Sequence, residues 1–177
     1  MRRFEVGILM ATAIGCGGSS LSGGGFATTP DQSVLTPAVV KVTLTSKGGG
    51  LSGGGQCSAA GVCVGGVFSY TLSLDTKRLA FNGSVYEGNP PMWVPVMDDV
   101  GLSASQLETL TGAARAVTVS AKRDCGADAS DRELTVESAT GALTYGDDFY
   151  GCLTTYDQFV TFDGLNNLQT AFAAVAP

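Results

Sequence analysis

Residues 67–74 form the most restrictive pattern in the chain, because polarity alternates at almost every position. The stretch reads Val-Phe-Ser-Tyr-Thr-Leu-Ser-Leu, so Phe, Tyr and Leu side chains point to one side and Ser and Thr to the other. This alternation predicts a β-strand with one buried and one solvated face. After a polar turn, Leu79, Phe81 and Val85 alternate again, which predicts the return strand of an antiparallel hairpin.

Further strands are predicted on both sides of this hairpin. β-Branched residues indicate a strand over 39–45, and residues 133–138 and 142–145 have the pattern of a second hairpin. Short extended pieces are expected at 117–121 and 159–162.

Two helices complete the predicted domain. Ser103 and Gln106 have the spacing of a capping box at the start of a helix that runs to about residue 116. Asp163 is expected to cap a last helix. Strands interrupted by helices indicate an α+β fold, here an antiparallel sheet built from two β-hairpins with two helices packed on one face.

The first residues have the features of an export signal. Arg2 and Arg3 precede an apolar run at 6–14, which is too short to span a bilayer as a helix. The sequence Ala-Ile-Gly-Cys at 13–16 resembles a bacterial lipobox, which implies cleavage before Cys16 and lipid on its sulfur. The alternative is an ordinary cleaved signal, or a short apolar N-terminus, in which Cys16 is incidental.

This interpretation divides the chain into three parts. We expect a lipoprotein signal peptide at 1–15, a flexible Gly/Ser tether at 16–37, and a single α+β domain at 38–177 with a Gly-rich loop at 47–56. Gly17 rather than Asp follows Cys16, which resembles the sorting signal for the bacterial outer membrane. The expected location is therefore a lipid anchor in that membrane, on its periplasmic or cell-surface face.

The cysteine count agrees with a lipid anchor. The chain has 5 Cys, an odd number that leaves one thiol unexplained in an exported protein. With Cys16 lipidated, the remaining cysteines can form two disulfides in three pairings, of which Cys57–Cys63 and Cys125–Cys152 are favoured. A four-cysteine metal site is the alternative, but the chain lacks the usual pairs of closely spaced cysteines.

The composition excludes several function classes. The chain has no His, so neither a Ser-His-Asp triad nor a His-ligated zinc site can form. A net charge of −6 argues against nucleic acid as a partner. The strings at 48–53 and 50–54 match a dinucleotide-binding and a nucleophile-elbow pattern, but no helix or His follows in the required place.

Residues 87–97 contain the only Trp, two of the four Met and three of the six Pro. Because proline cannot donate to a sheet ladder, the segment is predicted to be a loop. Met92 and Trp93 are candidate contacts for a protein partner. Alternatively, both side chains fold down and cap an open end of the core.

Aspartates are the only side chains with the potential for site chemistry. The residues concerned are Asp98, Asp99, Asp124, Asp128, Asp131, Asp147, Asp148 and Asp163. They could bind calcium if they gathered, although the chain has no Asp-x-Asp-x-Asp-Gly loop. Solvated loop charge is the simpler interpretation, so we expect no catalytic residue, no metal site and no cofactor.

The segments from Cys125 to Cys152 carry a resemblance to known proteins. Cys125-Gly-Ala-Asp, Leu134-Thr-Val and the segment from Leu143 to Cys152 resemble a pattern in small lipoproteins of Gram-negative bacteria, the myxobacterial kind especially. The resemblance covers roughly residues 67–176 and implies no activity. It does imply that Cys125 and Cys152 belong together.

These observations favour a membrane-anchored, non-enzymatic binding or structural module whose membrane contact is the lipid on Cys16. Its hairpin sheet and the Trp93 segment would form the contact surface for a protein partner. Two alternatives remain. One is a protease or hydrolase inhibitor that presents a stapled loop, and the other is a calcium-binding module.

Overall fold

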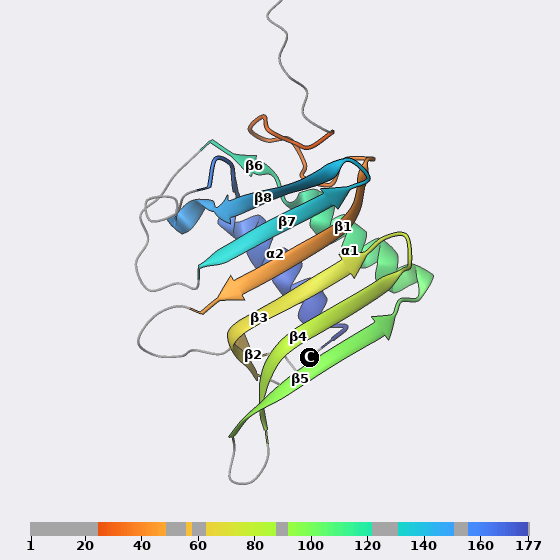
Figure 1. Ribbon diagram of the computed structural model, residues 1–177, viewed down its shortest axis with the longest axis vertical. Coiled ribbons are helices and arrows are strands. Elements are labelled where there is room, and N and C mark those ends of the chain that lie inside the picture. Colours follow the sequence, from red (N-terminus) through yellow and green to blue (C-terminus); the bar gives the residue numbers. More distant parts are fainter. Residues whose placement is uncertain are drawn as a thin grey trace, which may run out of the picture.

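The computed structural model describes residues 25–48, 56–57, 63–87, 92–121, 131–150 and 156–176. Within these ranges the chain is α+β, with two helices behind one large, mostly antiparallel sheet (Figure 1). The strands are β1 (Val39–Lys47), β2 (Gln56–Cys57), β3 (Cys63–Ser73), β4 (Arg78–Glu87), β5 (Met92–Gly101), β6 (Val119–Ser120), β7 (Arg132–Ser138), β8 (Gly141–Asp147) and β9 (Phe159–Val160). The helices are α1 (Ala104–Ala116) and α2 (Phe162–Ala173), and a single 3-10 turn, η1, covers Asp148–Tyr150.

The sheet order corrects the expectation of two simple hairpins. The strands lie in the order β5-β4-β3-β1-β7-β8-β9-β6, and β2 pairs with β3 outside this path. Strand β1 lies between the two hairpins and pairs antiparallel with both β3 and β7, while β8 and β9 are parallel. One continuous sheet results because β1 offers each hairpin a hydrogen-bonding edge.

The core lies between the sheet and the helices. Tyr70 of β3 is fully buried there, and its ring centroid lies 5.0 Å from that of Phe81 on β4 and 5.6 Å from that of Phe172 on α2. Leu134 and Tyr145 extend the same buried layer across β7 and β8. The predicted alternation of 67–74 and 79–85 is thereby confirmed, with Phe68, Tyr70, Leu72, Leu79, Phe81 and Val85 facing inward.

Strand β5 replaces the loop that was predicted around Trp93. Every residue of β5 from Met92 to Gly101 has a register partner on β4. The strand tolerates Pro95 because β5 is the last strand on its side of the sheet, where a missing N–H can face outward without breaking a ladder bond. The prolines led to the wrong prediction of a loop, because Pro95 lies in an edge strand.

The two helix starts differ in how well they were predicted. The Ser103–Gln106 capping box of α1 is confirmed, with both reciprocal hydrogen bonds present. At α2 the cap position is Thr161, which makes no side-chain cap bond, and Asp163 lies in the first turn. Asp148 serves instead, because its Oδ1 accepts from the Phe162 N–H at 2.8 Å.

The packed part of the chain includes residues that composition assigned to the tether. Ala27 and Val34 are fully buried, and the Tyr145 hydroxyl donates to the Ala27 carbonyl at 2.7 Å. The Asp31 N–H also donates to the Val119 carbonyl at 2.9 Å, so this segment is hydrogen-bonded at the β6 side of the sheet. The domain therefore begins before residue 38.

Candidate functional site

One face of the sheet carries no helix and is open to solvent (Figure 1). The register places alternate residues of β5, β4, β3, β1, β7 and β8 on this open face. Nine of them are uncharged polar residues: Thr43, Thr45, Ser69, Thr71, Ser73, Asn82, Ser84, Thr135 and Thr144. Two pairs among them are in hydrogen-bond contact, Thr43 with Thr71 at 3.2 Å and Thr135 with Thr144 at 2.8 Å.

The charged side chains of the open face are engaged in ion pairs. Lys41 Nζ lies 2.9 Å from Glu137 Oε2, its register partner on β7. Lys47 Nζ lies 2.7 Å from Glu133 Oε2, and Arg78 Nε lies 2.8 Å from Asp99 Oδ1. Among the described residues these six are the charged side chains that the register assigns to this face.

Exposed large apolar side chains are concentrated on three neighbouring strands at the β5 side of the sheet. We call Val67, Tyr86, Met92, Trp93 and Met97 the distal cluster; the five come from the neighbouring strands β3, β4 and β5. The register places Tyr86, Trp93 and Met97 on the open face, whereas Met92 pairs with Glu87 and lies on the opposite face of the strand end. Trp93 is 43% exposed and Tyr86 45%, and Met97 reaches 82%. Of six exposed large apolar residues in the described ranges, Val40 alone lies outside the cluster.

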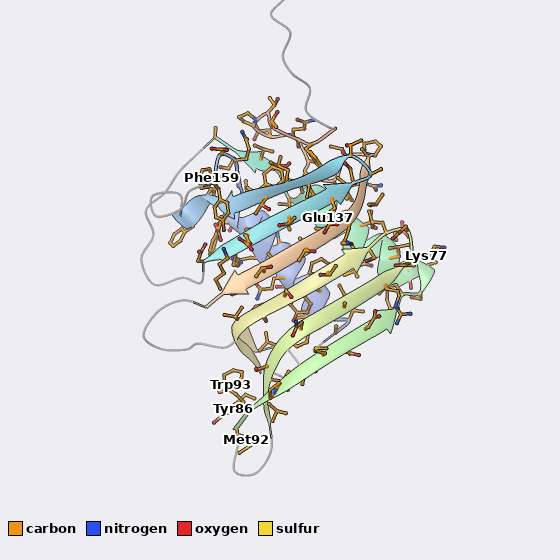
Figure 2. All side chains as sticks on the ribbon, in the orientation of Figure 1. Lys77, Tyr86, Met92, Trp93, Glu137 and Phe159 are labelled. Atoms are coloured by element: carbon orange, nitrogen blue, oxygen red, sulfur yellow. The ribbon has the colours of Figure 1, made fainter. Side chains whose placement is uncertain are left out.

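Cross-strand pairing brings Tyr86 and Trp93 together. They are register partners on β4 and β5, and their ring centroids lie 5.1 Å apart at a tilt of 47°. The alternative in which Met92 and Trp93 cap an open end of the core is not met, because both side chains are exposed. Figure 2 shows Tyr86, Met92 and Trp93 together at the end of the molecule opposite the segment that begins at residue 25. Tyr86 was missed in the sequence because its partner becomes apparent only once β5 is a strand.

A cluster of three polar side chains, Lys47, Glu133 and Tyr156, lies on the same face towards β8. The Lys47 amine donates to Tyr156 at 2.9 Å, and both contact Glu133 Oε2. The hydrogen bonds to Glu133 and Tyr156 raise the pKa of the Lys47 amine, so it stays a cation and is a poor nucleophile. Burial raises the pKa of Tyr156, and its bond to Glu133 adds to this effect. Lys47, Glu133 and Tyr156 thus form one hydrogen-bonded cluster that links β1 to β7.

On the helix side, Arg132 and Asp147 form a buried ion pair. The side chains are 4% and 0% exposed, and Arg132 Nη2 lies 2.7 Å from Asp147 Oδ2. The guanidinium also donates to Asn166 on α2 at 2.6 Å and lies over the Phe162 ring. Burial raises the pKa of Asp147 although Arg132 acts against this shift. The pair joins β7 and β8 to α2.

The aspartates do not gather into a cation site within the described residues. A groove of about 560 Å³ contains Asp31, Asp148 and Asp163 among its lining residues. Asp148 already accepts from Ser120 Oγ at 2.6 Å as well as from the α2 N-terminus. No group of three or more candidate ligands occurs in the described ranges, and Asp124 and Asp128 lie outside them.

Of the predicted cysteine sites, only Cys57 and Cys63 lie among the described residues. Cys57 and Cys63 are Cα register partners in the β2–β3 ladder. Cys16, Cys125 and Cys152 lie outside the described residues, as do the glycine strings at 49–55 and residues 58–62 of the stapled loop considered for an inhibitor. In the part of the chain that is described, no helix has the length and apolarity needed to cross a membrane.

Comparison with known proteins adds no relationship. No protein-family model, no curated protein and no solved structure matches this chain. The interpretation of the open face and the distal cluster therefore rests on their geometry.

Proposed function

We propose that the protein is an exported lipoprotein, anchored through lipid on Cys16, whose domain is a non-enzymatic binding module. The observation that carries this proposal is the exposed Tyr86–Trp93 pair within the distal cluster. Clustered exposed apolar side chains mark interaction surfaces, and Trp and Tyr contribute strongly to binding energy. Tyr86, Met92 and Trp93 also lie at the opposite end of the molecule from residue 25, so an N-terminal anchor leaves them free to meet a ligand (Figure 2).

The anchor is tested by Cys16→Ser in the full chain, expressed in a Gram-negative host. Removing the only sulfur at the predicted cleavage site should move most of the protein from the membrane pellet to the soluble fraction. Cys57→Ser is the matched control and should fractionate like the wild type. Equal pelleting of the Cys16→Ser protein would contradict the anchor.

The contact surface is tested by methionine oxidation. Of the four Met, only Met92 and Met97 would remain after signal cleavage, and they are 58% and 82% exposed. Peroxide should oxidise both rapidly to the sulfoxide in the purified protein. If a ligand covers the distal cluster, oxidation of Met97 should be several-fold slower in intact envelopes.

A reporter elsewhere on the surface controls for peroxide access. Val40→Met places a methionine at an exposed position outside the distal cluster. Its oxidation should be similar in envelopes and in purified protein. The contact-surface proposal fails if Met97 and the reporter are slowed to the same extent.

We also propose the Cys57–Cys63 disulfide. Support comes from the backbone register, since directly opposed residues of an antiparallel pair have Cα atoms within the range that a disulfide spans. Peptide mapping of the non-reduced protein should recover the two cysteines in one cross-linked peptide. A Cys57–Cys125 or Cys63–Cys152 peptide would refute this pairing.

A further inference from the structure

The described residues of the open face carry no net charge, although the chain as a whole carries −6. The three cations among them each lie within 2.9 Å of a carboxylate oxygen on the same face. A polyanion or a polycation would therefore find no unpaired charge among the described residues of this face. Charge complementarity favours an uncharged occupant.

Polar groups that can bond to such an occupant continue from the aromatic pair along the open face. On β4, Ser84 and Asn82 follow Tyr86 on the same face, and the register sets them opposite Pro95 and Met97. Asn82 is exposed and Ser84 is partly exposed. A hydroxyl thus stands next to the aromatic pair and an amide two residues further along β4, and the Ser/Thr-rich strands β3 and β1 continue the polar surface.

We propose that the open face binds an uncharged polysaccharide, with sugar rings packed on Trp93 and Tyr86. A pyranose ring has apolar C–H faces and a rim of hydroxyl groups. The C–H faces match the negative face of an aromatic ring. The hydroxyls match Asn82, Ser84 and the neighbouring threonines, which can both donate and accept. This inference rests on the proposed role of the distal cluster as the contact surface.

A lipid surface fits these observations less well. Amphipathic membrane-binding surfaces combine apolar side chains with free Lys or Arg that attract anionic headgroups. On the open face Lys41, Lys47 and Arg78 are each paired with a carboxylate. Asn82 and Ser84 would also have to be buried against the membrane as the rings entered it.

The test is affinity electrophoresis of the full chain carrying Cys16→Ser, so that no lipid is attached. The gels contain hydroxyethylcellulose, glycol chitin or pullulan as neutral glycans, or polygalacturonate as the anionic control. We expect at least one neutral glycan to retard the protein and polygalacturonate to have no effect. Retardation by polygalacturonate alone, or by no glycan, overturns the proposal.

Variants locate the site. Trp93→Ala should weaken retardation about tenfold, as expected for a central aromatic contact. Trp93→Phe keeps a ring and should retain most of the binding, whereas Val40→Ala should match the wild type. Because Trp93 is on the surface, each variant should keep the circular dichroism spectrum of the parent. Unchanged binding by Trp93→Ala contradicts the proposed site.

Two further outcomes separate this inference from the proposed function. If Met97 is protected from oxidation in envelopes but no neutral glycan retards the protein, the distal cluster remains a contact surface and a polysaccharide is excluded as its occupant. If the protein co-sediments with phosphatidylcholine vesicles and Trp93→Ala does not, the occupant is a membrane and the polysaccharide proposal is overturned.

Discussion

Replacing Arg132 with Met should lower the free energy of unfolding by about 3–5 kcal/mol, the range for breaking a buried ion pair. The change leaves the Asp147 carboxylate fully buried without its charged partner. It also removes the donor to Asn166 and the cation over the Phe162 ring, so α2 loses its polar link to the sheet. Urea denaturation followed by circular dichroism measures the loss.

Two controls separate charge burial from the loss of any ion pair. Arg78→Met breaks the exposed pair with Asp99 and should leave the urea midpoint almost unchanged, because solvent screens an exposed ion pair. The double variant Arg132→Met/Asp147→Leu removes both buried charges and should recover a large part of the loss. If Arg132→Met costs no more than Arg78→Met, the buried pair does not have the assigned role.

Replacing Phe172 with Ala should also cost about 3–5 kcal/mol, as for other buried Phe-to-Ala changes. Phe172 is fully buried, and its ring meets Tyr70 of β3 at 5.6 Å between centroids. Truncation leaves a cavity between α2 and the centre of the sheet, where the surrounding rings cannot close up fully. The same urea titration reports the effect.

Asn167 provides the matched helix control because it is exposed on α2. Asn167→Ala should leave stability within about 0.5 kcal/mol, since Ala is the better helix former and no core contact is lost. A small effect of Phe172→Ala would show that α2 does not depend on this residue for its packing against the sheet.

Local patterns predicted the parts of the fold that local contacts form. The alternation around Tyr70, the Ser103 capping box and the β7–β8 hairpin were read directly from the sequence, because each joins residues close in the chain. The position of β1 was not predicted, since its pairing with β7 joins segments about 90 residues apart. The residue that caps α2 was not predicted either, because Asp148 lies outside the helix.

The candidate site was only half predictable. Composition singled out Met92 and Trp93 but could not tell exposure from burial. Strand register decided this by pairing Trp93 with Tyr86 on the face that carries no helix. The sequence also did not predict that the charges of that face are paired, because Lys41 and Glu137 become neighbours only through the β1–β7 ladder.

The attachment of residues 25–34 at the β6 side of the sheet has a mechanical consequence. A pull between this segment and a ligand held at β5 would act across the strands, because β5 and β6 are the opposite ends of the strand order. Hydrogen bonds loaded in this direction open one after another rather than all together. Helix α1 leads the chain from β5 back to β6 behind the sheet, so its packing on α2 would share that load (Figure 1). The domain would then resist tension through its helical layer as well as through its sheet.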